Sequence, residues 1–140
     1  MQISKPAPRR TKVTSPFGPR KAPTPGASTF HKGLDFGGKF PVLVARNGKV
    51  VDKGYSANGY GHFVLIRHAE VTLKGVRYWQ TLYAHGEKAS HLTVGKRVKT
   101  GDRVYFSGHT GLATGDHLHF ELRKRVNKTY IPVDPAHFIR

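Results

Sequence analysis

The chain of 140 residues contains no cysteine and few acidic residues, with 8 Asp and Glu against 24 Lys and Arg. The absence of cysteine excludes disulfides, iron–sulfur clusters, thiolate zinc sites and cysteine nucleophiles together. Any metal must therefore be held by carboxylates and by some of the 9 histidines. The formal net charge of +16 predicts an anionic partner, which could be nucleic acid, anionic lipid or an acidic polymer of a bacterial envelope.

Long apolar runs are also absent, because no stretch approaches the roughly 18 apolar residues that a membrane-spanning helix needs. The basic N-terminus, residues 1–12, has no apolar segment behind it and so does not read as a secretory signal. We therefore expect a soluble, single-domain protein without a signal peptide, made in the cytoplasm, since this length suits one core.

The N-terminal segment differs in composition from the rest of the chain. Residues 1–32 hold no acidic residue and six prolines, which interrupt helices. We predict that residues 1–13 form a basic, flexible arm laid over the domain and that residues 14–140 form the domain itself.

From residue 41 onward, short β-branched and aromatic runs alternate with turns about every ten residues. This pattern predicts a mostly β fold, a single domain built on a twisted antiparallel sheet with a groove for the functional site and little helix. Asn47-Gly48 predicts a tight hairpin between the runs on either side of it. The one segment with some helical character is residues 87–92.

Two clusters carry metal-binding residue types. His31 and Asp35 are four residues apart, which places both side chains on one face of either a helix or a strand. His117 and His119 are two apart, so both imidazoles point to one side of a strand. Taken alone, each cluster could equally be a pair of ordinary surface side chains or a pair of metal ligands. Together they can supply the three N and O ligands of a catalytic zinc, and leave one histidine over as a base; His85 is a further candidate.

These residues make the chain resemble the lysostaphin/LytM-type zinc metallopeptidases, which cut peptide cross-links in bacterial cell walls. The resemblance covers about residues 14–135. Its motifs occur in a fixed order: SPFGPR at residues 15–20, FHKGLDF at 30–36, NGYG at 58–61, TLYAH at 81–85, GHTG at 108–111 and TGDHLHFE at 114–121.

The resemblance implies a role for each candidate residue. His31, Asp35 and His119 match the three ligands of one Zn²⁺ per chain. His85 and His117 match two histidines that do not bind the metal. One of this pair is expected to act as general base and the other to stabilise the developing oxyanion or to donate to the leaving amine.

The chain departs from the family pattern at Asp116, where proline is common, and at Gly86, where leucine is frequent. Neither change removes a reactive group. The resemblance also implies that Phe36, Tyr83 and the glycine-rich turn of residues 108–115 lie near the groove. We expect the other histidines to make ordinary hydrogen bonds and Trp79 to lie in the core.

The function that the resemblance implies is zinc-dependent hydrolysis of peptidoglycan cross-links by a monomer. By analogy we favour the D-Ala–diaminopimelate bond over the Gly-Gly bond. Since we expect no signal peptide and no wall-binding module, the predicted setting is a phage lysis enzyme, made in the host cytoplasm and acting on the wall after release, or else a virion-associated lysin.

Other hypotheses stay open beside the enzyme. A basic module of this fold could bind nucleic acid or an anionic envelope polymer, or the chain could be a structural part of a virion. The complete set of five site residues favours the enzyme, because binding does not need it. The cations spread over the arm and residues 88–103 without a base-reading element, so we expect contact with an anionic envelope and no specific nucleic acid.

Overall fold

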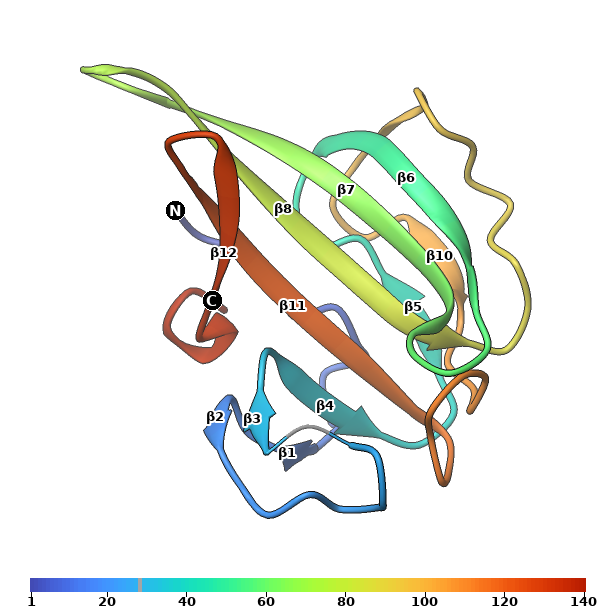
Figure 1. The fold of residues 1–140 in the computed structure, drawn as a ribbon. Coiled ribbons are helices and arrows are strands. Elements are labelled where there is room, and N and C mark those ends of the chain that lie inside the picture. The colour runs from blue at the N-terminus through green and yellow to red at the C-terminus, as the bar shows by residue number, and fades with distance from the viewer. Residues whose placement is uncertain (28) are drawn as a thin grey trace.

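The computed structural model describes residues 1–27 and 29–140 and consists almost entirely of strands (Figure 1). In chain order the elements are β1 (Val13–Ser15), β2 (Gly18–Pro19), β3 (Phe30–His31), β4 (Leu34–Gly37), β5 (Pro41–Leu43), β6 (Gly48–Ser56), β7 (Gly61–Thr72), β8 (Gly75–Gly86), β9 (Arg97–Val98), β10 (Arg103–Phe106), β11 (His117–Val126), β12 (Thr129–Val133) and the 3-10 helix η1 (Pro135–His137). Within the described part of the chain, no helix has the length and apolar character needed to cross a membrane.

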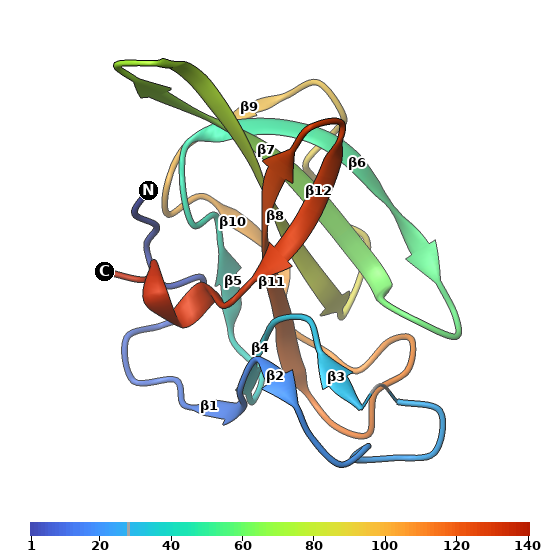
Figure 2. The same ribbon diagram turned by 60° about the vertical axis from the view of Figure 1, so that its left-hand side comes forward.

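One eight-stranded sheet dominates the fold, with the order β1-β4-β11-β8-β7-β6-β9 and with β12 paired to β11. Its neighbouring strands are antiparallel, and β5 with β10 and β2 with β3 form two small antiparallel ladders. Figure 2 shows how strongly the sheet twists between the β7–β8 hairpin and β4. The predicted mostly β, single-domain fold is confirmed.

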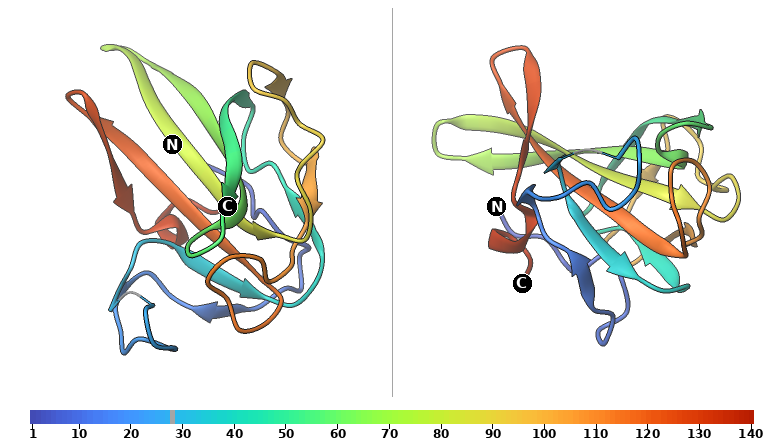
Figure 3. Two further views of the ribbon diagram at one scale, coloured as in Figure 1. Left: turned by 45° about the vertical axis from the view of Figure 1, so that its right-hand side comes forward. Right: turned by 60° about the horizontal axis from the view of Figure 1, so that its bottom comes forward.

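The two faces of the sheet have different roles. Leu118 and Phe120 of β11 are fully buried and pack in one core with Val42 of β5, Val104 of β10 and Trp79 of β8. Side chains alternate along a strand, so the residues between them point to the opposite face. Both chain termini lie on the core side of the sheet (Figure 3). The other face, which we call the open face, carries the histidines of β11, although Leu82, Ala84 and Glu121 on this face are also buried.

The N-terminal segment, for which the sequence predicts a flexible arm, makes specific contacts with the domain. Ile3 is 2% exposed, forms a parallel bridge with Ile139 and belongs to the core. Further along, the backbone N–H of Leu43 donates to the carbonyl of Pro6 at 2.9 Å, and Ala7 is buried. The start of the segment is therefore packed, because its few apolar residues fill core space while its cations stay at the surface.

The predicted hairpin at Asn47-Gly48 is wrong. β5 pairs with β10, whereas β6 pairs with β7 and β9, so these two residues connect two different sheets. The Asn47 side chain accepts a bond from the backbone of Thr100 at 2.8 Å. A Cβ on Gly48 would lie 2.4 Å from the carbonyl oxygen of Arg67, so glycine here permits close packing against β7. Residues 87–92 form bends rather than a helix.

Candidate active site

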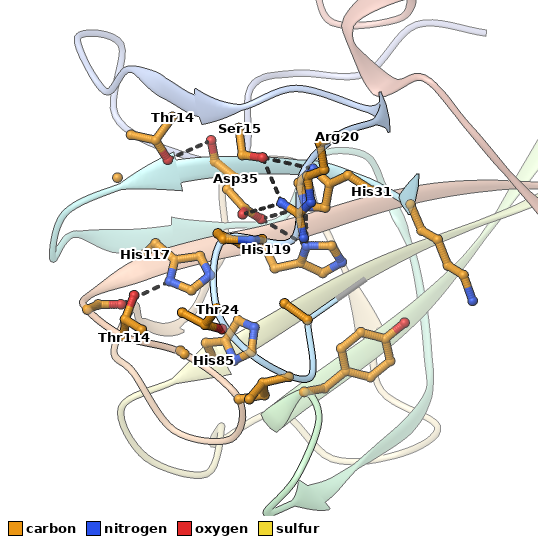
Figure 4. A pocket seen from close by; sticks show the side chains of 18 of the residues that line it. Thr14, Ser15, Arg20, Thr24, His31, Asp35, His85, Thr114, His117 and His119 are labelled. Carbon is orange, nitrogen blue, oxygen red and sulfur yellow. Dashed lines mark hydrogen bonds and ion pairs between the residues drawn. The ribbon is translucent and has the colours of Figure 1, made fainter. Parts of the chain in front are cut away.

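Three side chains converge on the open face of the sheet: His31 from β3, Asp35 from β4 and His119 from β11 (Figure 4). The Oδ1 atom of Asp35 lies 3.0 Å from Nε2 of His31 and 2.9 Å from Nδ1 of His119. The two ring nitrogens are 3.1 Å apart. These three atoms lie close enough together to bind one metal ion. Among the described residues, His31, Asp35 and His119 form the group of side chains that could hold a metal.

The backbone explains why these three residues meet. Asp35 and His119 stand directly opposite each other in the β4–β11 ladder, so their side chains share a face. Gly33 lets the turn between β3 and β4 lie against β11, since a Cβ there would be 2.1 Å from the carbonyl oxygen of Phe120. This close approach brings His31 back over Asp35.

Hydrogen bonds fix which ring nitrogens are free to bind a metal. Nδ1 of His31 donates to the carbonyl of Pro16 at 2.8 Å, which leaves the Nε2 lone pair pointing at the cluster. Nε2 of His119 donates to Oε2 of Glu121 at 2.7 Å, which leaves Nδ1 for the cluster. A carboxylate or carbonyl behind each histidine is the usual outer support of a metal-binding imidazole.

Glu121 is fully buried and is the centre of a second polar network. The hydroxyl of Tyr60 donates to Oε2 at 2.6 Å, and the guanidinium of Arg123 donates to Oε1 at 3.0 Å. Burial raises the pKa of Glu121, but the bonds from His119 and Tyr60 and the Arg123 charge outweigh it and lower the pKa to about 2. The carboxylate is therefore charged when it supports His119.

The metal-free cluster has strongly coupled charges. Burial opposes ionisation of Asp35, yet its hydrogen bonds to His119 and His31 bring its pKa well below the usual range. Burial likewise lowers the pKa of His119, but Asp35 and Glu121 on its two sides raise the pKa to about 9. His119 thus carries a proton that a metal would displace, so metal binding should release protons.

His85 reaches the same site through an irregularity in β8. Tyr83 points into the core, so strict alternation would send His85 to the core as well. A bulge between β7 and β8, where His62 pairs with Gly86 but Val64 pairs with Tyr83, adds one residue to β8. His85 takes a φ of 66° there, and its ring turns toward His117, with ring centroids 4.6 Å apart.

Both histidines of this pair have a fixed tautomer. Nδ1 of His85 donates to the carbonyl of Thr110 at 2.7 Å, and Nδ1 of His117 donates to the carbonyl of Gly115 at 2.9 Å. Each Nε2 is therefore left as a proton acceptor. Burial lowers the pKa of His85 to about 4, and this outweighs its bond to Thr110, so the ring is neutral near pH 7.

A groove of about 680 Å³ passes over the five predicted residues. Its walls come from the segment before β4, including Arg20 and Lys21, and from the turn before β11, including Leu112 and Thr114. The guanidinium of Arg20 donates to Oγ of Ser15 at 2.7 Å and lies 3.8 Å from Oδ2 of Asp35. The groove is therefore lined by cations on one side and by small and apolar side chains on the other.

The structure explains both departures from the family pattern. Gly86 faces Tyr105, whose ring would lie 2.2 Å from a Cβ at this position, so a larger residue would not fit. Asp116 accepts a bond from Nδ1 of His109 at 2.7 Å at the exposed rim of the groove. The expected place of Phe36 and Tyr83 near the groove is wrong, because both are buried in the core on the other face.

Several residues for which the sequence predicted no individual role belong to this site. Glu121 follows His119 by two residues on the same face, so strand alternation could have identified it. Tyr60 stacks on His119 with ring centroids 5.8 Å apart, and it arrives from the turn between β6 and β7. Thr110 holds His85 through its backbone, which no side-chain pattern signals.

The comparisons with known proteins agree with this geometry. The model of peptidase family M23 matches residues 29–135. An uncharacterized metalloprotease of Haemophilus influenzae is 40% identical over 119 residues, which are 83% of this chain and 23% of that protein. A DD-carboxypeptidase/endopeptidase, Mpg, of Neisseria meningitidis is 38% identical over 115 residues, which are 81% and 24% of the two chains. The chain thus spans about a quarter of the length of these curated relatives.

Solved structures show the same fold. A zinc-containing peptidase from Vibrio cholerae superposes with a TM-score of 0.77 and 31% identity, over 96% of this chain and 39% of that one. The catalytic domain of lysostaphin from Staphylococcus simulans superposes with a TM-score of 0.71 and 29% identity, over 91% of both chains. Fold and site together are those of a metallopeptidase, and the chain belongs to peptidase family M23.

Proposed function

We propose that this chain is a zinc-dependent endopeptidase that hydrolyses peptide cross-links of bacterial peptidoglycan. The observation that carries the proposal is the convergence of His31, Asp35 and His119 in a groove beside two histidines that do not join the cluster. Peptidoglycan as the substrate is supported by relatives named peptidoglycan DD-endopeptidases, ShyB and ShyC of Vibrio cholerae, each 34% identical to this chain.

The donor set fits zinc. Two imidazole nitrogens and one carboxylate oxygen form a ligand triad without sulfur, which is typical of catalytic rather than structural zinc sites. The hydrogen bonds of His31 to Pro16 and of His119 to Glu121 already select the nitrogens that would bind. When bound, zinc would polarise the scissile carbonyl and lower the pKa of water to about 7.

The remaining two histidines handle protons. Each Nδ1 donates to a backbone carbonyl, so Nε2 of His85 and Nε2 of His117 are left as proton acceptors. Both residues line the groove. We assign to this pair the removal of a proton from the attacking water and the delivery of a proton to the leaving amine. Neutral imidazole suits the first step near pH 7, and the low pKa of His85 keeps that ring neutral.

We infer that the bond cleaved is the D-Ala–diaminopimelate cross-link rather than a Gly-Gly bridge. Mpg, ShyB and ShyC, whose names specify DD-peptidase activity, are 34–38% identical to this chain, whereas a structure titled as a putative glycyl-glycine endopeptidase, LytM from Ruminococcus gnavus, is 26% identical. A D-Ala–diaminopimelate cross-link joins two D-configured centres and is therefore a bond of the DD type. The biological setting that we propose is phage lysis, with an anionic envelope attracting the positive chain.

The test is wall hydrolysis measured together with metal content. Purified protein is added to sacculi with direct diaminopimelate cross-links and to sacculi with glycine bridges, each with and without a chelator. We expect release of peptides with new D-Ala termini from the first wall, and we expect the chelator to stop it. Release from neither wall, by protein that holds one zinc per chain, would reject the proposed function.

A further inference from the structure

The face of the sheet that carries the site also carries a row of cations. Residues directly opposite each other on antiparallel neighbours share a face. The register pairs Arg97 with Lys49, Lys49 with Arg67, Arg67 with Gln80, and Gln80 with Arg123. These residues come from β9, β6, β7, β8 and β11, and they form one line across the sheet. We call this line the cation row.

The cation row points away from the core. Val50, Ile66 and His68, the neighbours of Lys49 and Arg67 along β6 and β7, are fully buried. Side chains alternate along a strand, so Lys49 and Arg67 project from the open face. Arg67 and Arg97 are exposed to solvent, and Lys49 and Arg123 are half-buried. The strands that carry the row can be followed in Figures 1 and 2.

The row lies beside the metal cluster. Arg123 follows His119 by four residues on β11, which corresponds to about 13 Å along a strand. Four strand spacings separate Arg97 from Arg123, so the row is about 19 Å long. It is therefore close enough for a polymer bound in the groove to continue across it.

The charges of the row are poorly neutralised. Among its cations, Arg123 alone has a carboxylate partner within the described residues, Glu121 at 2.8 Å. Asp52, which pairs with Leu65, lies on the same face one line nearer the site, and its carboxylate accepts a bond from the backbone N–H of Lys53 at 2.8 Å. Like charges directly opposite one another destabilise a sheet. A bound anion would remove that repulsion.

Aromatic contacts hold part of this surface in place. The guanidinium of Arg67 lies 5.1 Å from the centre of the Tyr78 ring, and that of Arg125 lies 6.0 Å from the same ring. Tyr78 thus orients two guanidinium groups on neighbouring strands. Guanidinium groups held in this way present planar pairs of N–H donors, which match the two oxygens of a carboxylate.

We propose that the cation row binds the carboxylates of peptidoglycan stem peptides, with the wall strand lying across β11, β8, β7 and β6 while one cross-link occupies the groove. This assignment rests on the proposed function, which makes the wall polymer the ligand of the adjoining groove. Stem peptides carry free carboxylates at regular intervals, which is the charge pattern that a line of cations about 19 Å long complements.

The test compares two charge-matched double variants. In the row variant Lys49 and Arg67 are both replaced by glutamine. In the control, Lys74 and Lys128, exposed lysines in the turns after β7 and β11, are replaced by glutamine. Both pairs are placed in a His117→Ala background, which is expected to keep the metal and leave the wall intact. Binding is measured by co-sedimentation with phosphate-free sacculi that have direct diaminopimelate cross-links.

We expect the row variant to bind about five-fold more weakly at low salt and the control to bind within two-fold of its parent. Amidation of the wall carboxylates should abolish the difference between the two. Equal losses in both variants would mean a general charge effect and would overturn the proposal. A difference that occurs only with walls retaining phosphate polymers would overturn the choice of carboxylate.

A second measurement separates this proposal from the proposed function. With His117 intact, both double variants are assayed on a soluble cross-linked peptide dimer, which is too short to reach the row. We expect cleavage at the parental rate. If neither the parent nor the variants cleave the dimer, yet the row variant binds walls more weakly, the proposed endopeptidase function is wrong and the proposed role of the cation row is supported. If all three proteins cleave the dimer and both variants bind walls equally well, the proposed role of the cation row is wrong and the proposed endopeptidase function is supported.

Discussion

Replacement of Glu121 by glutamine should weaken metal binding without unfolding the protein. Glu121 is fully buried, and its two oxygens take bonds from His119 at 2.7 Å, from Tyr60 at 2.6 Å and from Arg123 at 3.0 Å. Glutamine keeps the shape but has one acceptor oxygen, so its amide must turn two hydrogens toward groups that are themselves donors. Either His119 or Arg123 therefore loses its acceptor.

The magnitude follows from the position of Glu121. A carboxylate behind a metal-binding histidine contributes about 10- to 100-fold to metal affinity. An unsatisfied buried donor costs about 2 kcal/mol of folding free energy. Arg123 can turn partly to solvent, since its side chain is 21% exposed, so the stability loss should not exceed this figure by much.

The assay is zinc competition against a chelating dye, with urea unfolding of the same samples. Arg123→Gln serves as the control, because it leaves the carboxylate on His119 and should reduce zinc affinity less than Glu121→Gln does. At saturating zinc, Glu121→Gln should recover most of its turnover. Unchanged zinc affinity in Glu121→Gln, with the fold intact, would refute the role assigned to this network.

Further predictions concern single histidines and the metal ligands. His31→Ala and Asp35→Ala should lose bound zinc by elemental analysis, whereas His117→Ala should keep zinc and lose turnover; full wall-lysing activity in His117→Ala would show that its role is misassigned. His85→Gly and His85→Ala should both lose turnover, but the glycine variant should be about 1 kcal/mol more stable to urea, because φ is 66° at this position; equal stabilities would argue against strain there. Burial lowers the pKa of His68 to about 4, so between pH 6.5 and 4 the unfolded chain binds a proton that the folded chain does not. The free energy of unfolding should therefore decrease as the pH is lowered through this window, by about 3 kcal/mol from this group. His68→Gln should lose less stability than the parent between pH 7 and 4.5, and parallel losses would contradict this account.

Only part of the ligand cluster could be predicted from short-range rules. Two residues apart on a strand means one shared face, so His117 and His119 had to point together. Placing His31 and Asp35 beside them required the resemblance to a family, since no local rule brings β4 next to β11. The structure supplies this link as the register that sets Asp35 opposite His119.

Other features depend on contacts that local patterns do not specify. The bulge that turns His85 to the open face follows from how β7 and β8 pair, and alternation alone would have placed this ring in the core. The pair Asn47-Gly48 has the composition of a hairpin, but its glycine serves close packing against β7. Ile3 lies in a proline-rich basic segment, yet it fills a space beside Ile139 at the opposite end of the chain.

The most direct test of the central claim is a zinc titration of metal-free protein, with cleavage of a soluble peptide dimer cross-linked through D-Ala and diaminopimelate as the readout. We predict no cleavage without metal, a rise in cleavage that ends at one zinc per chain, and products with a new D-Ala carboxylate identified by mass. Cleavage that persists in the metal-free protein, or a zinc-loaded protein that leaves the dimer intact, would contradict it.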